Sequence, residues 1–145
     1  MNQHLVLRVV AKMLLPPILL FALYVQFHGD FGPGGGFQAG MIFAAAFILY
    51  ALVFGLEAAR RVVPEGVVRA AMAVGLLIFA GVGFAGLLLG GNYLNYSVLA
   101  ENQKVGQHLG ITLIEFGVGT TVAAVMITIF FAFAGRSARM SDEDW

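Results

Sequence analysis

Long apolar stretches separated by short polar segments dominate the chain. A membrane-spanning helix needs about 20 mostly apolar residues, and three stretches meet this requirement. Residues 37–56 contain Gln38 as their one strongly polar residue, residues 70–91 contain none, and residues 109–134 contain a single charge, Glu115. The pattern therefore predicts transmembrane helices at about these three positions.

A fourth span is predicted at the N-terminus, over about residues 5–27. The uncharged part of this segment is too short to cross a bilayer, so the helix is expected to begin near Leu5 and to include Arg8 and Lys12. The long side chains of these two residues can reach the headgroups. Pro16 and Pro17 lie inside this span, and each removes a backbone donor, so we expect a kink or a local break. No small-residue cleavage site follows, which favours a retained span over a signal peptide.

Positive charge lies almost entirely on one side of these spans. Because cytoplasmic segments carry an excess of Lys and Arg, the bias predicts that both termini are cytoplasmic. The chain is thus expected to be an all-α integral membrane protein, one membrane domain over residues 1–145 with four spans and a short cytoplasmic tail at 135–145. The biased side holds Arg8, Lys12, Arg60, Arg61, Arg69, Arg136 and Arg139, and the opposite side holds Lys104.

Composition agrees with a membrane protein and narrows the chemistry. The chain is 60% hydrophobic and 11% charged, against about 25% charged residues in soluble domains. The formal net charge is zero, so nothing indicates nucleic-acid binding. Cysteine is absent and the histidines show no ligand spacing. We therefore expect no metal site, no cofactor and no enzymatic activity.

Small residues recur at helical spacing in three of the predicted spans. Such stripes allow helix backbones to approach closely in lipid, and four helices offer few partners among themselves, which favours additional protein neighbours. The alternative is that glycine is simply more frequent in membrane helices. The stripes are Gly36, Gly40 and Ala44; Gly83, Gly86 and Gly90; and Gly110, Gly117, Thr121, Ala124 and Thr128.

The most distinctive segment, 28–40, joins the first two spans on the side opposite the arginines. Its glycines allow a sharp turn and a close backbone approach to a neighbour. A phosphate-binding loop is disfavoured because no Gly-Lys-Ser/Thr ending is present. We expect a tight, rigid re-entry into the membrane, with Gln38 able to bond backbone groups freed at the turn.

These residues resemble the MnhB/MrpB family, whose members are small membrane components of multisubunit Na+/H+ antiporters of the Mrp type. The resemblance rests on Tyr24-Val25, on the glycine segment and on an acidic residue before Gly-Val in the last span, Glu115–Val118. The glycine motif comprises His28, Gly29, Pro33, Gly34, Gly35, Gly36, Phe37, Gln38 and Gly40.

The resemblance implies a small subunit of a hetero-oligomeric monovalent cation (Na+)/proton antiporter. Its partners would be the other membrane subunits of that complex, and its location would be a bacterial or archaeal cell membrane, which it crosses several times. A related domain occurs at the C-terminal end of the large subunit of such antiporters, and similar chains occur in membrane-bound hydrogenase complexes. The short, separate chain favours the stand-alone MnhB type.

Glu115 is the main candidate for ion chemistry. A charged side chain at the bilayer centre costs about 2.5–3.5 kcal/mol on insertion scales, and such residues usually face a polar cavity or a partner. His108 and Thr112 lie towards the same end of the span, so the three predict a short polar track for Na+ or H+. The alternative is that Glu115 bonds a neighbouring subunit and serves assembly alone.

The leading hypothesis is a subunit that depends on its partners, because one embedded carboxylate without a counter-charge is not expected to run exchange alone. A purely structural subunit, of this complex or of a hydrogenase-type complex, is the second hypothesis. A third is an autonomous four-helix multidrug exchanger. Those transporters carry their glutamate in the first helix, where this chain has no acid.

Overall fold

The computed structural model describes residues 5–29 and 34–137, and this part of the chain contains helices and no strand. Pro33 of the glycine motif and the predicted tail beyond residue 137 lie outside the described residues. The elements are α1 (Leu5–His28), α2 (Gly36–Phe54), α3 (Leu56–Val62), α4 (Glu65–Leu88), the short 3-10 helix η1 (Tyr96–Leu99) and α5 (Gln103–Ser137).

Four of these helices, α1, α2, α4 and α5, are long and apolar enough to cross a membrane. The all-helical architecture with four candidate spans predicted from the sequence is therefore confirmed. Much of their surface is exposed apolar side chain, and α1 buries little beyond Ala11, Ala22 and Gln26. Such a surface suits a lipid solvent, where apolar side chains need not be hidden.

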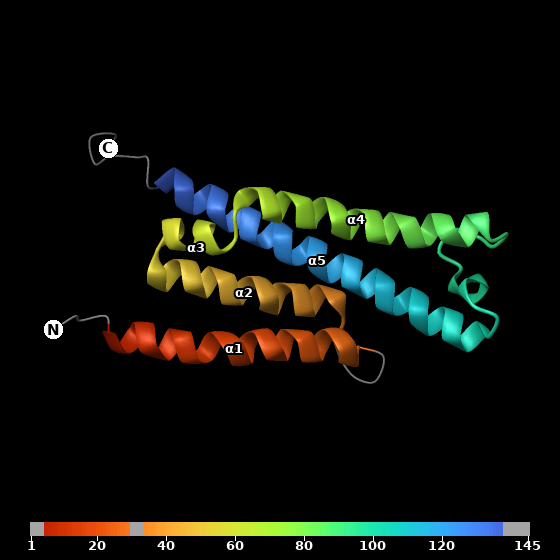
Figure 1. The fold of residues 1–145 in the computed structure, drawn as a ribbon, viewed down its shortest axis with the longest axis horizontal. Helices are drawn as coiled ribbons and strands as arrows, with labels where there is room; N and C mark the ends of the chain where they lie inside the picture. Colours follow the sequence, from red (N-terminus) through yellow and green to blue (C-terminus); the bar gives the residue numbers. More distant parts are fainter. Residues whose placement is uncertain (1–4, 30–33, 138–145) are drawn as a thin grey trace.

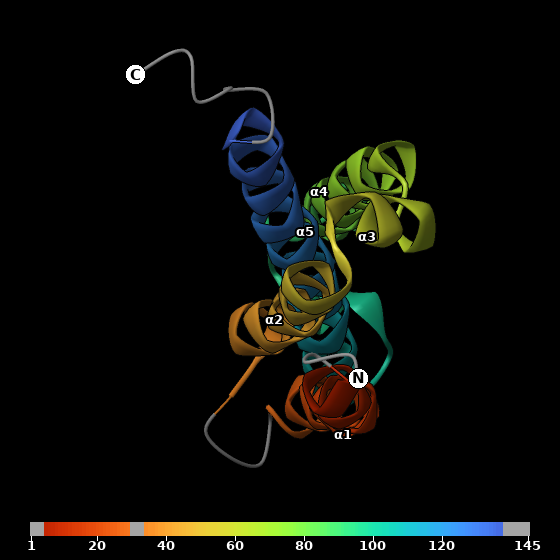
Figure 2. The ribbon, with the colours of Figure 1, turned by 90° about the vertical axis from the view of Figure 1, so that its left-hand side faces the viewer.

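Helix α5 is the centre of the bundle. Helix α2 packs against one side of it and α4 against another, while α1 packs mainly on α2 (Figures 1 and 2). Helix α1 runs through Pro16 and Pro17 as one continuous helix. The local break expected there does not occur, because two adjacent prolines remove only two backbone donors from a long helix.

Glycines bring the backbones of these helices together. A Cβ atom at Gly40 would lie 2.5 Å from the carbonyl oxygen of Gly119, which places α2 directly against α5. A Cβ at Gly75 would lie 2.6 Å from the carbonyl oxygen of Gly117 and would collide with the hydroxyl of Thr121, which places α4 against α5. Only glycine permits either approach.

The loop between α4 and α5 covers most of the other small residues in the predicted stripes. Tyr93 covers Gly83, Asn92 and Asn95 lie over Gly86, and the ring of Tyr96 covers Gly110. Gly90 lies beyond the end of α4, with φ +83° and open space around it. Most stripe positions are thus covered by other parts of the same chain. The sequence analysis took the stripes to favour additional protein neighbours, and the structure removes this argument.

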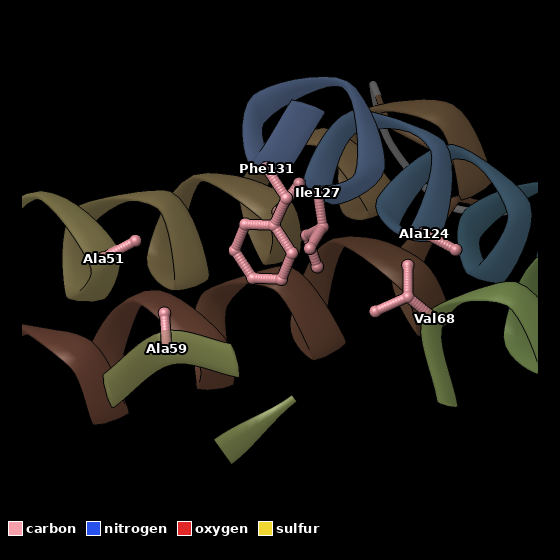
Figure 3. Packing of buried hydrophobic residues seen from close by; sticks show 7 residues of the cluster. Ala51, Ala59, Val68, Ala124, Ile127 and Phe131 are labelled. Carbon is pink, nitrogen blue, oxygen red and sulfur yellow. The ribbon is translucent and has the colours of Figure 1, made fainter. Parts of the chain in front are cut away.

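At the opposite end, α3 returns the chain across the bundle. Gly55, with φ +95°, separates α2 from α3, and Pro64 precedes α4. Helix α3 was not predicted, because it is only 7 residues long and charged. Its Ala59 packs in the main core cluster with Ala44, Ala51, Val68, Ala124, Ile127 and Phe131 (Figure 3).

The helices are staggered along the bundle axis. Helix α2 begins beside Glu115, whereas α5 begins at Gln103, about 18 Å earlier at about 1.5 Å per residue. Helix α4 likewise continues to Leu88, about 20 Å past Gly75. Figure 1 shows α4 and α5 extending beyond the facing ends of α1 and α2. Glu115 therefore lies well inside α5 but at the end of α2.

The packing predicts that Gly75→Leu destabilises the chain, whereas Gly81→Leu does not. Position 75 has no room for a side chain, while nothing lies within 4 Å of a Cβ at Gly81 on the same helix. We expect Gly75→Leu to lower the free energy of unfolding by about 1–3 kcal/mol, the usual cost of overpacking. SDS-titrated unfolding of the purified chain, followed by tyrosine near-UV circular dichroism, measures this. Equal effects of the two variants would contradict the described α4–α5 contact.

Candidate functional site

The carboxylate of Glu115 lies against the glycine segment between α1 and α2. A Cβ atom at Gly29 would be 2.9 Å from Oε2 of Glu115, and one at Gly35 would be 2.9 Å from Oε1. A Cβ at Gly36 would overlap the backbone oxygen of Glu115. The two features that the sequence singled out separately therefore form one site.

The glycines of the motif are needed where the chain closes around this carboxylate. Gly29 and Gly35 face its two oxygens, and any side chain there would displace it. Gly34 has φ +145°, a conformation that favours glycine, and lies against Val25 of α1. The turn thus fits an acidic side chain that approaches from a helix about 80 positions later.

The carboxylate also lies at the N-terminus of α2. The first backbone N–H groups of a helix have no partner within the helix. The N-cap residue Gly35 contributes no side-chain hydrogen bond, and the first α2 bond runs from the Ala39 N–H to the Gly35 carbonyl, at 3.0 Å. An acidic group complements the partial positive charge at such an end. Glu115 therefore occupies the place of a capping side chain supplied by another helix.

Gln26 is a second polar side chain near the site, and the sequence analysis missed it. It lies on α1, is only 9% exposed, and its Oε1 lies 2.5 Å from where a Cβ at Gly119 would be. An amide in a run of apolar helix residues was the available signal. The side chain of Gln26 is buried because α1 packs near α5, and this contact between distant segments cannot be read from the sequence around Gln26.

His108 and Thr112 lie on α5 towards its start, on the part that extends beyond α1 and α2. The Thr112 hydroxyl donates to the His108 carbonyl oxygen at 2.8 Å. Its proton is used by the helix backbone, while its oxygen keeps acceptor capacity. His108 is exposed and Thr112 is half-buried. These two residues and Glu115 thus follow one another along a single helix.

The larger side chains of the motif are exposed. The exposed ring of His28 stacks on Tyr24, with ring centroids 4.9 Å apart. Phe37 and Gln38 are exposed at the first turn of α2, and Gly40 is buried against Gly119. The motif therefore divides into glycines that contact α1 or α5 and larger side chains that are exposed.

A groove of about 450 Å³ runs between α1 and α2 on one side and the start of α4 on the other, above α5. Its lining is almost entirely apolar, with Gln26 and Thr120 as polar contributors. Phe116 lines the groove, whereas Glu115, the preceding residue, does not. Among the described residues, no group of three or more His, Cys, Asp or Glu side chains could hold a metal ion.

Comparison with known proteins places the chain in a family. A family model described as "Domain related to MnhB subunit of Na+/H+ antiporter" matches residues 6–128. A protein of Staphylococcus haemolyticus (strain JCSC1435), named "Putative antiporter subunit mnhB2", is 34% identical over 142 residues, covering 92% of this chain and 96% of the relative. A relative of the same name from Staphylococcus aureus (strain Newman) is 34% identical over 137 residues, with the same coverage. The chain belongs to the MnhB family, as its glycine motif indicates.

Proposed function

We propose that this chain is a non-autonomous small subunit of a monovalent cation (Na+)/proton antiporter. It packs against other membrane subunits in a bacterial or archaeal cell membrane, with both termini on the cytoplasmic side. The observation that carries the proposal is the Glu115 carboxylate enclosed by Gly29 and Gly35 at the start of α2. The names of the relatives, as antiporter subunits, support it.

The distribution of charge explains why the chain would need partners. Among the four long helices, Glu115 is the acidic residue away from the helix ends, since Glu65 is the first residue of α4. The two lysines of the chain are Lys12, in the first half of α1, and Lys104, at the start of α5. Repeated proton and cation transfer across a bilayer needs several polar groups in sequence. Other subunits would supply the remainder.

The proposed ion path follows α5 from His108 past Thr112 to Glu115. This part of α5 lies beyond the ends of α1 and α2, so an ion reaches Glu115 without passing between those helices. At Glu115 the carboxylate would exchange between the α2 N-terminus and an arriving cation or proton. In the structural alternative, Glu115 would only fix the turn and no ion would reach it.

An exposed row of small residues on α4 supports packing against another subunit. Unlike the stripes that contact α5, this row faces away from the chain's own helices. Gly66 and Gly81 have open space around them, and the alanines between them are exposed. Small residues on a lipid-facing surface allow a partner helix to approach closely. The row consists of Gly66, Ala70, Ala73 and Gly81, with the exposed Leu77 between the last two.

The path role predicts that Glu115→Gln abolishes transport without preventing assembly. The amide keeps the shape but cannot carry a proton or balance a cation. We expect sodium-dependent proton flux per assembled complex to fall at least about tenfold, equivalent to about 1.4 kcal/mol. Flux in proteoliposomes, normalised to complex content, measures this. Unchanged flux per complex with a reduced complex yield would establish the structural alternative instead.

The enclosed carboxylate predicts energetic coupling between positions 35 and 115. The methyl group in Gly35→Ala displaces Oε1, whereas Glu115→Asp shortens the side chain and makes room. In a double-mutant cycle of unfolding free energies, we expect the double variant to be more stable than the sum of the single changes predicts, by about 0.5–3 kcal/mol. Gly66→Ala, at an open position, is the control. Strictly additive effects would show that the described contact does not form.

The exposed row on α4 predicts that Gly81→Leu impairs assembly. This change leaves the isolated chain intact because nothing lies within 4 Å of that position. A leucine there would hold a partner helix away. We expect a several-fold lower yield of complex in co-purification with the other subunits, with no loss of the chain from the membrane. A normal yield would place the partner contact on another face.

A further inference from the structure

Arg60 of α3 is held across the last turns of α5. Its Nη2 donates to the carbonyl oxygen of Phe131 at 3.5 Å and lies 3.3 Å from Oε1 of Glu65. Its guanidinium carbon is 5.9 Å from the centroid of the Phe131 ring. Gly135 permits this position, since a Cβ there would lie 2.9 Å from Nη2. The turn at Gly55 is what brings α3 back to α5.

These contacts leave part of the guanidinium group unsatisfied. Arginine carries five N–H donors and no acceptor. In Arg60, the Phe131 carbonyl and the Glu65 carboxylate both contact Nη2. The Nε atom is buried and has no hydrogen-bond partner among the described residues. A buried, charged donor without an acceptor is costly. The Arg60 side chain as a whole is 40% exposed, so a further acceptor can approach it from outside the chain.

A cavity of about 280 Å³ lies beside Arg60 and is lined by a second arginine. Its walls are Arg60, Phe131, Ala132, Gly135 and Arg136, and none of them is acidic. Two guanidinium groups around one cavity match a multiply charged oxyanion, because phosphate oxygens can accept paired arginine donors. Two positive charges also offset the partial negative charge at the end of α5.

The cavity lies at the end of the candidate span formed by α5, which closes at Arg136. It is at the end of α5, close to where α2 ends and α3 turns back (Figure 1). Ile129 and Phe133, on the same last turns of α5, are exposed apolar side chains. An oxyanion that is attached to an apolar chain fits this combination, whereas a free anion would gain nothing from the apolar part.

We propose that Arg60 and Arg136 bind the phosphate group of an anionic phospholipid. Basic pockets between membrane helices are suited to lipid headgroups. Glu65 competes with the phosphate for Arg60, because the carboxylate and the phosphate are acceptors for the same guanidinium. The site would fasten a lipid at the junction of α3 and α5, independently of any transport role.

The test measures retention of phosphatidylglycerol by the full-length chain in neutral detergent, using native mass spectrometry. Phosphatidylcholine and inorganic phosphate serve as separate competitors. The variant Arg60→Gln/Arg136→Gln is compared with Arg61→Gln/Arg69→Gln, which removes the same charge from exposed positions outside the cavity. Glu65→Gln is the third variant, and circular dichroism checks that each remains folded.

We expect phosphatidylglycerol affinity to fall about tenfold in Arg60→Gln/Arg136→Gln and less than about twofold in the control pair. Glu65→Gln should strengthen binding, since it frees Arg60, and this result remains informative if the double arginine variant does not fold. Equal losses in both arginine pairs would reduce the effect to general surface charge and overturn the site. Displacement by inorganic phosphate at equal concentration would show an anion site without lipid preference, and it would overturn the lipid assignment.

Discussion

The close approach of the α5 backbone to α2 at Glu115 is the contact on which the site depends. The glycine segment has no side chain at the positions that face the carboxylate, so the acid of one helix can lie at the unpaired end of another. The carboxyl oxygens lie where α2 lacks a capping side chain, and the end of α2 carries a partial positive charge. In a membrane, the carboxyl group of Glu115 and the N-terminus of α2 would each have a higher free energy without the other.

The same principle holds along the rest of α5. Gly40 against Gly119, and Gly75 against Gly117, let two helices contact α5 at backbone distance from different sides. In lipid, where apolar surface is not expelled from the solvent, this close packing has to supply most of the association energy.

The two polar regions of the chain lie towards opposite ends of the bundle. Glu115 and the residues before it on α5 face the end opposite the arginines, where α4 and α5 extend beyond α1 and α2. Arg60 and Arg136 lie at the other end, beside the apolar surface that a bilayer would cover. The proposed transport role rests on the first region and the proposed lipid site on the second.

The sequence by itself determined the four apolar helices and the family, and it singled out the glycine motif and Glu115 as candidates, because run length, composition and local motifs are properties of neighbouring residues. It did not show that Glu115 enters the glycine turn, or that the small-residue stripes are occupied within the chain. Gln26, Arg60 and α3 were likewise missed. These features arise where residues distant in sequence meet, and only the tertiary structure decides which faces of the helices come together.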